Sequence, residues 1–284
     1  MKLLPGDPFQ DEQGVPEHIL LSIRQHWGLE DPILVQYGRF LKSALTLDFG
    51  PSLKYQEHTI LDIIVSGAPY SLRLGLQALL IAIPFGIGYG VIMALYNNTR
   101  ASLPLAIFSS FGASIPTFVI AACLQFTFAI FFSLFPIARW DEPYGTVLPT
   151  LALAIGPAFQ IARLMKASFI DVLQEPYIWT ARMKGLPEWK VLTRHALKNA
   201  LIPLLPFIGP LVATILSGSF VVERIYAIPG LGQWFVNAVL NRDYPLIGAM
   251  TLVYSIILLA LHFIVEFMQL LLDRRLCTHQ PHYA

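Results

Sequence analysis

The chain has 284 residues, of which 55% are hydrophobic and only 13% charged, and its formal net charge is +1. Soluble domains carry about 25% charged residues, so this composition excludes a disordered chain and disfavours a soluble enzyme, whose single core would not hide so much apolar surface. A net charge near zero also offers no basic face for nucleic acid. The composition therefore indicates an all-α polytopic membrane protein.

Residues 1–68 are too polar to cross a membrane and are predicted to form an extracytoplasmic segment. Its pattern predicts two short amphipathic helices, one between Pro16 and Gly28 and one that follows Asp31 and Pro32. Such a segment serves either as an outer platform for a soluble partner or a lipid surface, or as a cap packed on the membrane helices. The sequence favours neither role.

Five later stretches are apolar enough to cross a bilayer, which takes about 20 apolar residues. They are 69–96, 103–135, 146–165, 201–222 and 246–272. The second is too long for one straight helix, and Pro116 is expected to divide it. Gly86 and Gly90 are four residues apart, which predicts close contact between two helices rather than a nucleotide-binding loop.

The Lys and Arg residues near the ends of the spans predict the orientation. They place the loop 166–200 and the tail 274–284 in the cytoplasm, so the C-terminus is predicted inside. Five spans then leave residues 1–68 outside, although no span precedes them to carry them across. We therefore expect that a first span is missing from this chain.

The cytoplasmic loop is predicted to be a helix–turn–helix. Pro176 can start a helix that runs to Lys184, and Gly185 can end it in the left-handed conformation. Pro187 can then start a second helix, with Glu188 in its first turn. A rigid helix at this position can insert into a groove of a partner or lie on anionic lipid, and physical reasoning weighs these equally.

This loop resembles the cytoplasmic EAA loop of bacterial ABC importer permeases, in the branch for oligopeptides, dipeptides and nickel. The matching strings are residues 180–187 and 194–203. Residues 5–9, 47–52, 228–233 and 240–245 resemble further signatures of that branch, and the outer segment is most similar to B-type oligopeptide permease subunits. Trp179-Thr180-Ala181 replaces the wider Glu-Ala-Ala consensus, as in the peptide branch. Members of the family have a membrane span before the string that resembles residues 5–9, which agrees with the expectation that a first span is missing from this chain.

The resemblance implies a type I ABC importer fold and a non-enzymatic permease subunit that forms half of an oligopeptide pathway in the bacterial inner membrane. Its implied partners are a second homologous permease, two ATPase subunits or domains, an extracytoplasmic peptide-binding protein and the lipid bilayer. ATP and Mg would bind the ATPases, because this chain has no phosphate-binding loop and is expected to hold no cofactor, metal or catalytic residue.

By the same resemblance, the ATPase-coupling residues are Ala181, Arg182, Lys184, Gly185, Leu186 and Pro187. Ala181 is expected to keep the helix thin enough to enter a partner's groove. The segment with Pro229, Gly230 and Gly232 is expected to form a tight bend before a helix over 233–240 and to contribute to the outer gate.

Some polar residues fall inside the predicted spans, where they are costly. They either line the substrate path or, as we favour, form hydrogen bonds between helices: Gln77, Gln125, Gln160, His262 and Glu266.

The sequence leaves other cargoes possible, namely dipeptides, nickel complexes or another small solute. An ion-coupled secondary transporter is the alternative of a different class, and its uptake would persist without ATP.

Overall fold

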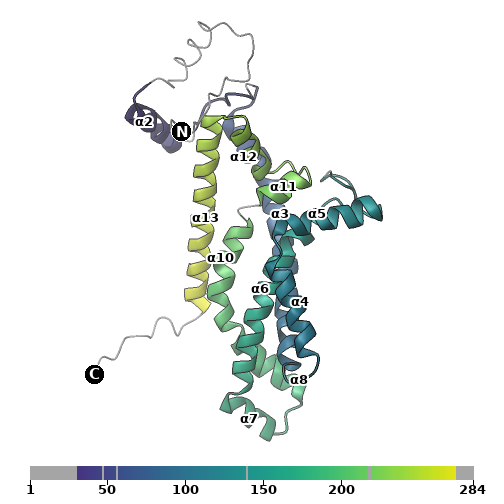
Figure 1. The fold of residues 1–284 in the computed structure, drawn as a ribbon. Helices are drawn as coiled ribbons and strands as arrows, with labels where there is room; N and C mark the ends of the chain where they lie inside the picture. The colour runs from purple at the N-terminus through teal and green to yellow at the C-terminus, as the bar shows by residue number, and fades with distance from the viewer. Residues whose placement is uncertain (1–30, 47, 56, 139, 217–218, 273–284) are drawn as a thin grey trace, which may run out of the picture.

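The computed structural model describes residues 31–46, 48–55, 57–138, 140–216 and 219–272 (Figure 1). The segment 1–30, with the predicted helix from Pro16 to Gly28, and the tail 273–284 lie outside the described residues. Within them the elements are α2 (Ile33–Thr46), α3 (Ile60–Leu95), α4 (Ser102–Ser114), α5 (Thr117–Leu124), the π-helix η1 (Gln125–Phe131), α6 (Val147–Leu173), α7 (Pro176–Met183), α8 (Glu188–Lys190), the π-helix η2 (Val191–Ala196), α9 (Leu197–Ala200), the 3-10 helix η3 (Ile202–Leu204), α10 (Leu205–Leu216), α11 (Phe220–Ile225), α12 (Leu231–Leu240) and α13 (Tyr244–Leu272).

The described residues contain four helical segments that are long and apolar enough to cross a membrane, namely 60–95, 147–173, 188–225 and 244–264. A fifth is added if α4 and the segment 117–131 form one span, although they meet at an angle of 99°. The break falls at Pro116, as predicted. Pro116 has no N–H to continue a helix, and it holds Ile115 in an extended conformation.

Helix α3 begins at Ile60, before the predicted span 69–96 and inside the segment 1–68 that was predicted to be extracytoplasmic. Thr59 and Asp62 form a capping box, in which each side chain accepts a hydrogen bond from the other's backbone N–H, at 3.1 and 3.3 Å. This fixes the start of α3 at Ile60, so residues 60–68 and the predicted span form one continuous helix.

Helices α3 and α6 form the most extensive contact among the described elements. A Cβ atom added at Gly86 would lie 2.6 Å from the carbonyl oxygen of Ala158, and one at Gly90 would lie 2.6 Å from that of Ala162. Both glycines therefore let the two backbones approach, which confirms the predicted helix contact.

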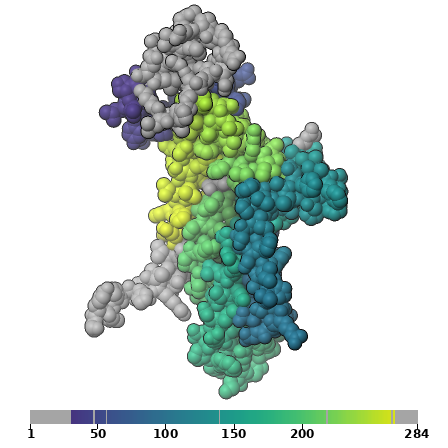
Figure 2. All heavy atoms as spheres, viewed as in Figure 1, coloured from purple at the N-terminus to yellow at the C-terminus, as the bar shows by residue number. Residues whose placement is uncertain are grey.

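Two buried clusters lie toward opposite ends of this helix pair. One joins α6 to α7, η2 and α9 through residues that include Phe169, Ile178 and Val191. The other joins the start of α3 to α12 and α13 through Ile60 and Leu246. Figure 1 shows α7 and α12 at opposite ends of the long axis. The segment α5–η1 projects sideways; α5 packs on α6 and α11 at its base, and Figure 2 shows the far end of the segment extending from the surface.

Candidate functional site

The turn after α7 has the backbone conformation that the sequence predicts. Pro176 is the first residue of α7 and Lys184 is its C-cap. Gly185 follows with φ +73°, and its N–H donates to the carbonyl oxygen of Arg182 at 2.9 Å. Other residues rarely adopt this φ, so Gly185 determines where the helix ends.

An ion pair joins the two sides of this turn. A guanidinium nitrogen of Arg182 lies 2.6 Å from a carboxylate oxygen of Glu188, and Nε of Arg182 donates to the other oxygen at 3.3 Å. The predicted second helix starts as expected after Pro187, but α8 is only three residues long before the π-helix η2 continues the chain. We call residues 176–190 the coupling turn.

Ala181, one of the expected coupling residues, faces the rest of this chain. Its side chain is buried, at 5% exposed, and belongs to the cluster with Ile178 and Phe169. It therefore packs within this chain, in the cluster that joins α7 to α6 and η2, and its part in ATPase coupling stays a prediction. Besides charged residues such as Lys184, the exposed side chains of this turn include large apolar residues that the sequence analysis missed: Trp179, Met183 and Trp189. The spacing of Trp179 and Met183, four residues apart on one helix face, was the available signal.

Two of the predicted intramembrane polar residues connect helices or segments by hydrogen bonds. Gln77 accepts from Thr150 Oγ1 at 3.2 Å, which links α3 to α6. Gln125 Nε2 donates to the carbonyl oxygens of Ile137, at 2.7 Å, and Ile225, at 3.2 Å. These bonds agree with the role that we favour for such residues.

The other three polar residues do not join them in one site. Gln160 is half-buried on α6, His262 is half-buried on α13, and Glu266 is exposed one helical turn farther along α13. Their role therefore stays a prediction.

The predicted outer-gate residues pack around a buried carboxylate that the sequence analysis did not single out. Glu223 Oε1 accepts from Ser71 Oγ at 2.9 Å, and Oε2 accepts from the backbone N–H of Gly232 at 2.7 Å. A Cβ atom at Gly232 would lie 2.6 Å from Cα of Phe220. The bend also ends earlier than expected: α12 begins at Leu231 because the carboxylate satisfies N–H groups of its first turn.

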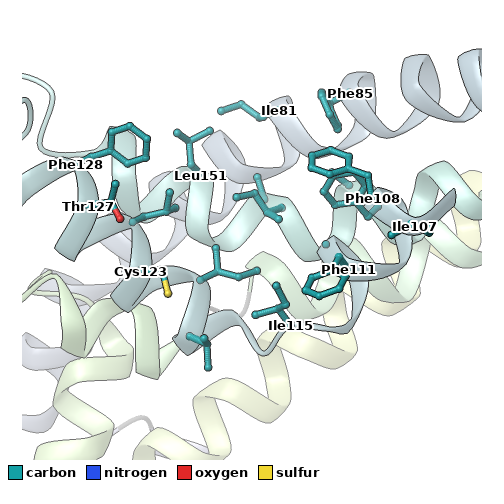
Figure 3. Close-up of a pocket in the computed structure, with 18 of the residues that line it drawn as sticks. Ile81, Phe85, Ile107, Phe108, Phe111, Ile115, Cys123, Thr127, Phe128 and Leu151 are labelled. Atoms are coloured by element: carbon teal, nitrogen blue, oxygen red, sulfur yellow. The ribbon is translucent and has the colours of Figure 1, made fainter. Parts of the chain in front are cut away.

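A large apolar groove of about 880 Å³ lies between α3, α4, α5 and α6 (Figure 3). Its lining is almost wholly aromatic and aliphatic, with Thr127 and Cys123 as its polar contributors. Such a lining gives a peptide's charged termini nothing to bind, so the groove does not qualify as a peptide site. Within the described ranges there is also no cluster of three or more His, Cys, Asp or Glu residues that could hold a metal ion.

Comparison with known proteins places this arrangement in a family. Residues 86–277 match the family described as binding-protein-dependent transport system inner membrane component. The dipeptide transport system permease protein DppB of Bacillus subtilis (strain 168) is 44% identical over 283 residues, which cover 99% of this chain and 91% of that protein. The oligopeptide transport system permease protein OppB of Salmonella typhimurium (strain LT2) is 42% identical over 254 residues, which cover 89% of this chain and 83% of that protein.

The fold is also found in a solved structure of the MetNI methionine ABC transporter in an inward-facing conformation. That structure matches with a TM-score of 0.61 at 16% identity, and the match covers 74% of this chain and 96% of the other. It confirms the predicted fold class of a polytopic helical ABC importer permease. With the family match over most of the chain and relatives above 40% identity, this chain belongs to the family of binding-protein-dependent transport system inner membrane components.

Proposed function

We propose that the chain is a permease subunit of an ATP-driven, binding-protein-dependent importer of oligopeptides, and that the coupling turn docks on an ATPase subunit. The membrane-spanning helices and the family support a transport role without catalysis by this chain. The relatives named as peptide permeases support a peptide cargo. A dipeptide, a nickel complex or another small solute is the alternative cargo, and competition uptake with labelled di- and oligopeptides distinguishes them.

The partners follow from the same proposal. A second homologous permease would complete the pathway, two ATPase subunits or domains would bind ATP and Mg at the cytoplasmic side, and a binding protein would deliver cargo outside. The chain would lie in the bacterial inner membrane with its C-terminus in the cytoplasm, so that the coupling turn faces the ATPases and α12 faces outward.

The observation that carries the coupling role is a turn that exposes large apolar side chains beside charged ones and has a buried base. Met183 is 88% exposed and Trp179 is 59% exposed, whereas Ile178 is fully buried in the cluster that joins α7 to η2 and α6. Exposed large apolar side chains fit a groove in a partner. Since the buried base shares a cluster with residues of α6 and η2, a push on the coupling turn would be transmitted to α6 through packed side chains.

The test is Gly185→Val in the transporter with its partners. A Cβ atom at Gly185 has no atom within 4 Å, so the substitution acts through the backbone, whose φ of +73° a β-branched residue does not adopt without strain. We expect normal membrane insertion but loss of ATP-driven uptake. Gly88→Val on α3 is the matched control, because Gly88 also has open space around it and no positive φ.

Normal uptake by Gly185→Val would refute the coupling role. Uptake by the unaltered transporter that persists after ATP depletion, with the ion gradient held, would instead identify an ion-coupled secondary transporter.

A further inference from the structure

Helix α12 is held at its first turn by a carboxylate that is removed from solvent. Glu223, on α11, is fully buried at 0% exposed. Besides Ser71 and Gly232, the backbone N–H of Gln233 donates to it. Burying a carboxylate is costly unless its oxygens are hydrogen-bonded, and the first turn of α12 supplies donors where the helix dipole also favours an anion. The position of Glu223 and the start of α12 therefore fix each other.

Ser71 extends this contact to a third helix. Its hydroxyl donates to Glu223 Oε1 at 2.9 Å and accepts from the backbone N–H of Leu231, also at 2.9 Å. Ser71 is itself buried on α3. One hydroxyl thus bridges α3, α11 and α12. We call Ser71, Glu223 and the N–H groups of residues 231–233 the latch.

A second serine–carboxylate pair holds the other end of α12. Asp243, which follows α12, is fully buried and accepts a hydrogen bond from the hydroxyl of Ser52, which is also buried. Its other oxygen accepts from the backbone N–H of Leu246 at 3.2 Å, in the first turn of α13. Because both ends of α12 are tied to buried groups, α12 is fixed to its neighbours and cannot rotate independently of them.

The latch lies on a continuous route through the molecule. Helix α3 runs without a break from Ile60 to Leu95, with Ser71 near the α12 end and the close contact of Gly86 and Gly90 with α6 farther along. Helix α6 continues to the cluster that holds the coupling turn. The coupling turn and α12 are therefore connected through packed helices and one buried hydrogen-bond network, which is the physical requirement for coupling between them.

We propose that the Ser71–Glu223 latch carries the movement of α3 to α12, which makes Ser71 and Glu223 positioning residues for opening of the outer gate. The inference rests on the proposed function, because it takes the coupling turn as the point where ATP hydrolysis acts. It goes beyond that function by naming the contact through which the opposite end of the permease responds. Neither residue needs to touch cargo for this role.

The test compares Ser71→Ala, Glu223→Ala and Glu223→Gln in the complete transporter, with radiolabelled dialanine or trialanine as the probe, whichever the unaltered transporter accumulates. Complex assembly, ATP hydrolysis and uptake are measured together. We expect Ser71→Ala and Glu223→Ala to hydrolyse ATP while uptake per ATP falls about tenfold, in keeping with one or two lost buried hydrogen bonds. Glu223→Gln keeps an acceptor for α12 and should restore most of the uptake.

Val221→Ala is the matched control, because Val221 lies on α11 but is exposed; it should behave like the unaltered protein. A merely structural role would lower assembly, hydrolysis and uptake in parallel, and that result overturns the proposal, as does unchanged uptake per ATP in Ser71→Ala. If Glu223→Ala fails to assemble, Ser71→Ala and Glu223→Gln decide the question. ATP-independent uptake by the unaltered transporter would instead show that the proposed function, rather than the latch, is wrong.

Discussion

Single residues in this chain show two different reasons for glycine. At Gly185 the reason is the backbone, since φ is +73° and no atom lies near the missing side chain. At Gly86 and Gly90 the backbone is helical, and the reason is the neighbouring helix, whose carbonyl oxygens leave no room for a Cβ atom. The sequence could predict both, because each depends on local spacing or on a simple packing rule.

The close α3–α6 contact gives a test at the level of a residue. Gly90→Val should lower the stability of the purified permease by about 1–3 kcal/mol or more, because the added side chain overlaps Met165 and the backbone of Ala162. Thermal unfolding followed by size-exclusion chromatography measures the change. Gly88→Val, in open space on the same helix, should leave the unfolding temperature nearly unchanged; equal losses in both variants would contradict the packing explanation.

Secondary-structure elements were predictable where Pro and Gly set the local backbone and not where distant residues decide. The start of α7 at Pro176, its end before Gly185 and the break at Pro116 follow from the chain itself. The start of α12 does not follow from the local sequence. Glu223 fixes it together with Ser71, which lies 152 residues away in the sequence. A contact between residues so far apart cannot be predicted from a local sequence pattern.

The projecting element α5–η1 gives a test at the level of an element. Gln125, the first residue of η1, ties this element to Ile137 and to Ile225 at the end of α11. Gln125→Leu removes both bonds, of which one is exposed and one half-buried, so the loss should cost about 1 kcal/mol. We expect faster amide hydrogen exchange across residues 117–131, read by mass spectrometry.

Phe126→Leu is the control for this experiment. Its side chain is exposed and it removes no hydrogen bond to the rest of the chain. Exchange that rises equally in both variants would show that Gln125 does not anchor the element.

At the scale of the whole molecule, the coupling turn and helix α12 lie at opposite ends of the long axis (Figure 1). The family and the helical fold were predictable because the motifs and the apolar spans occur along most of the chain. The apolar groove was not predictable, since its lining comes from α3, α4, α5, η1 and α6 and each part of it has the sequence of ordinary membrane-facing residues.

The proposed orientation can be tested by cysteine labelling from the two sides of the membrane. In a background with Cys123 and Cys277 replaced by serine, Lys184→Cys lies in the coupling turn, and Tyr144→Cys lies in the loop before α6, where Tyr144 is exposed. A membrane-impermeant maleimide added to intact cells lacking the outer barrier should label Tyr144→Cys only. The same reagent added to inverted vesicles that have been stripped of the ATPase subunits should label Lys184→Cys only.

This outcome follows because α6, which lies between the two positions, is long and apolar enough to cross the membrane once, and because basic residues gather on the coupling-turn side, which the positive-inside rule assigns to the cytoplasm. Labelling of both positions from one side would mean that α6 does not cross. The reverse pattern would place the coupling turn outside, out of reach of any ATPase, and would remove the basis for both the proposed function and the latch. A permeant maleimide, which should label both variants in either preparation, controls for buried or unfolded cysteines.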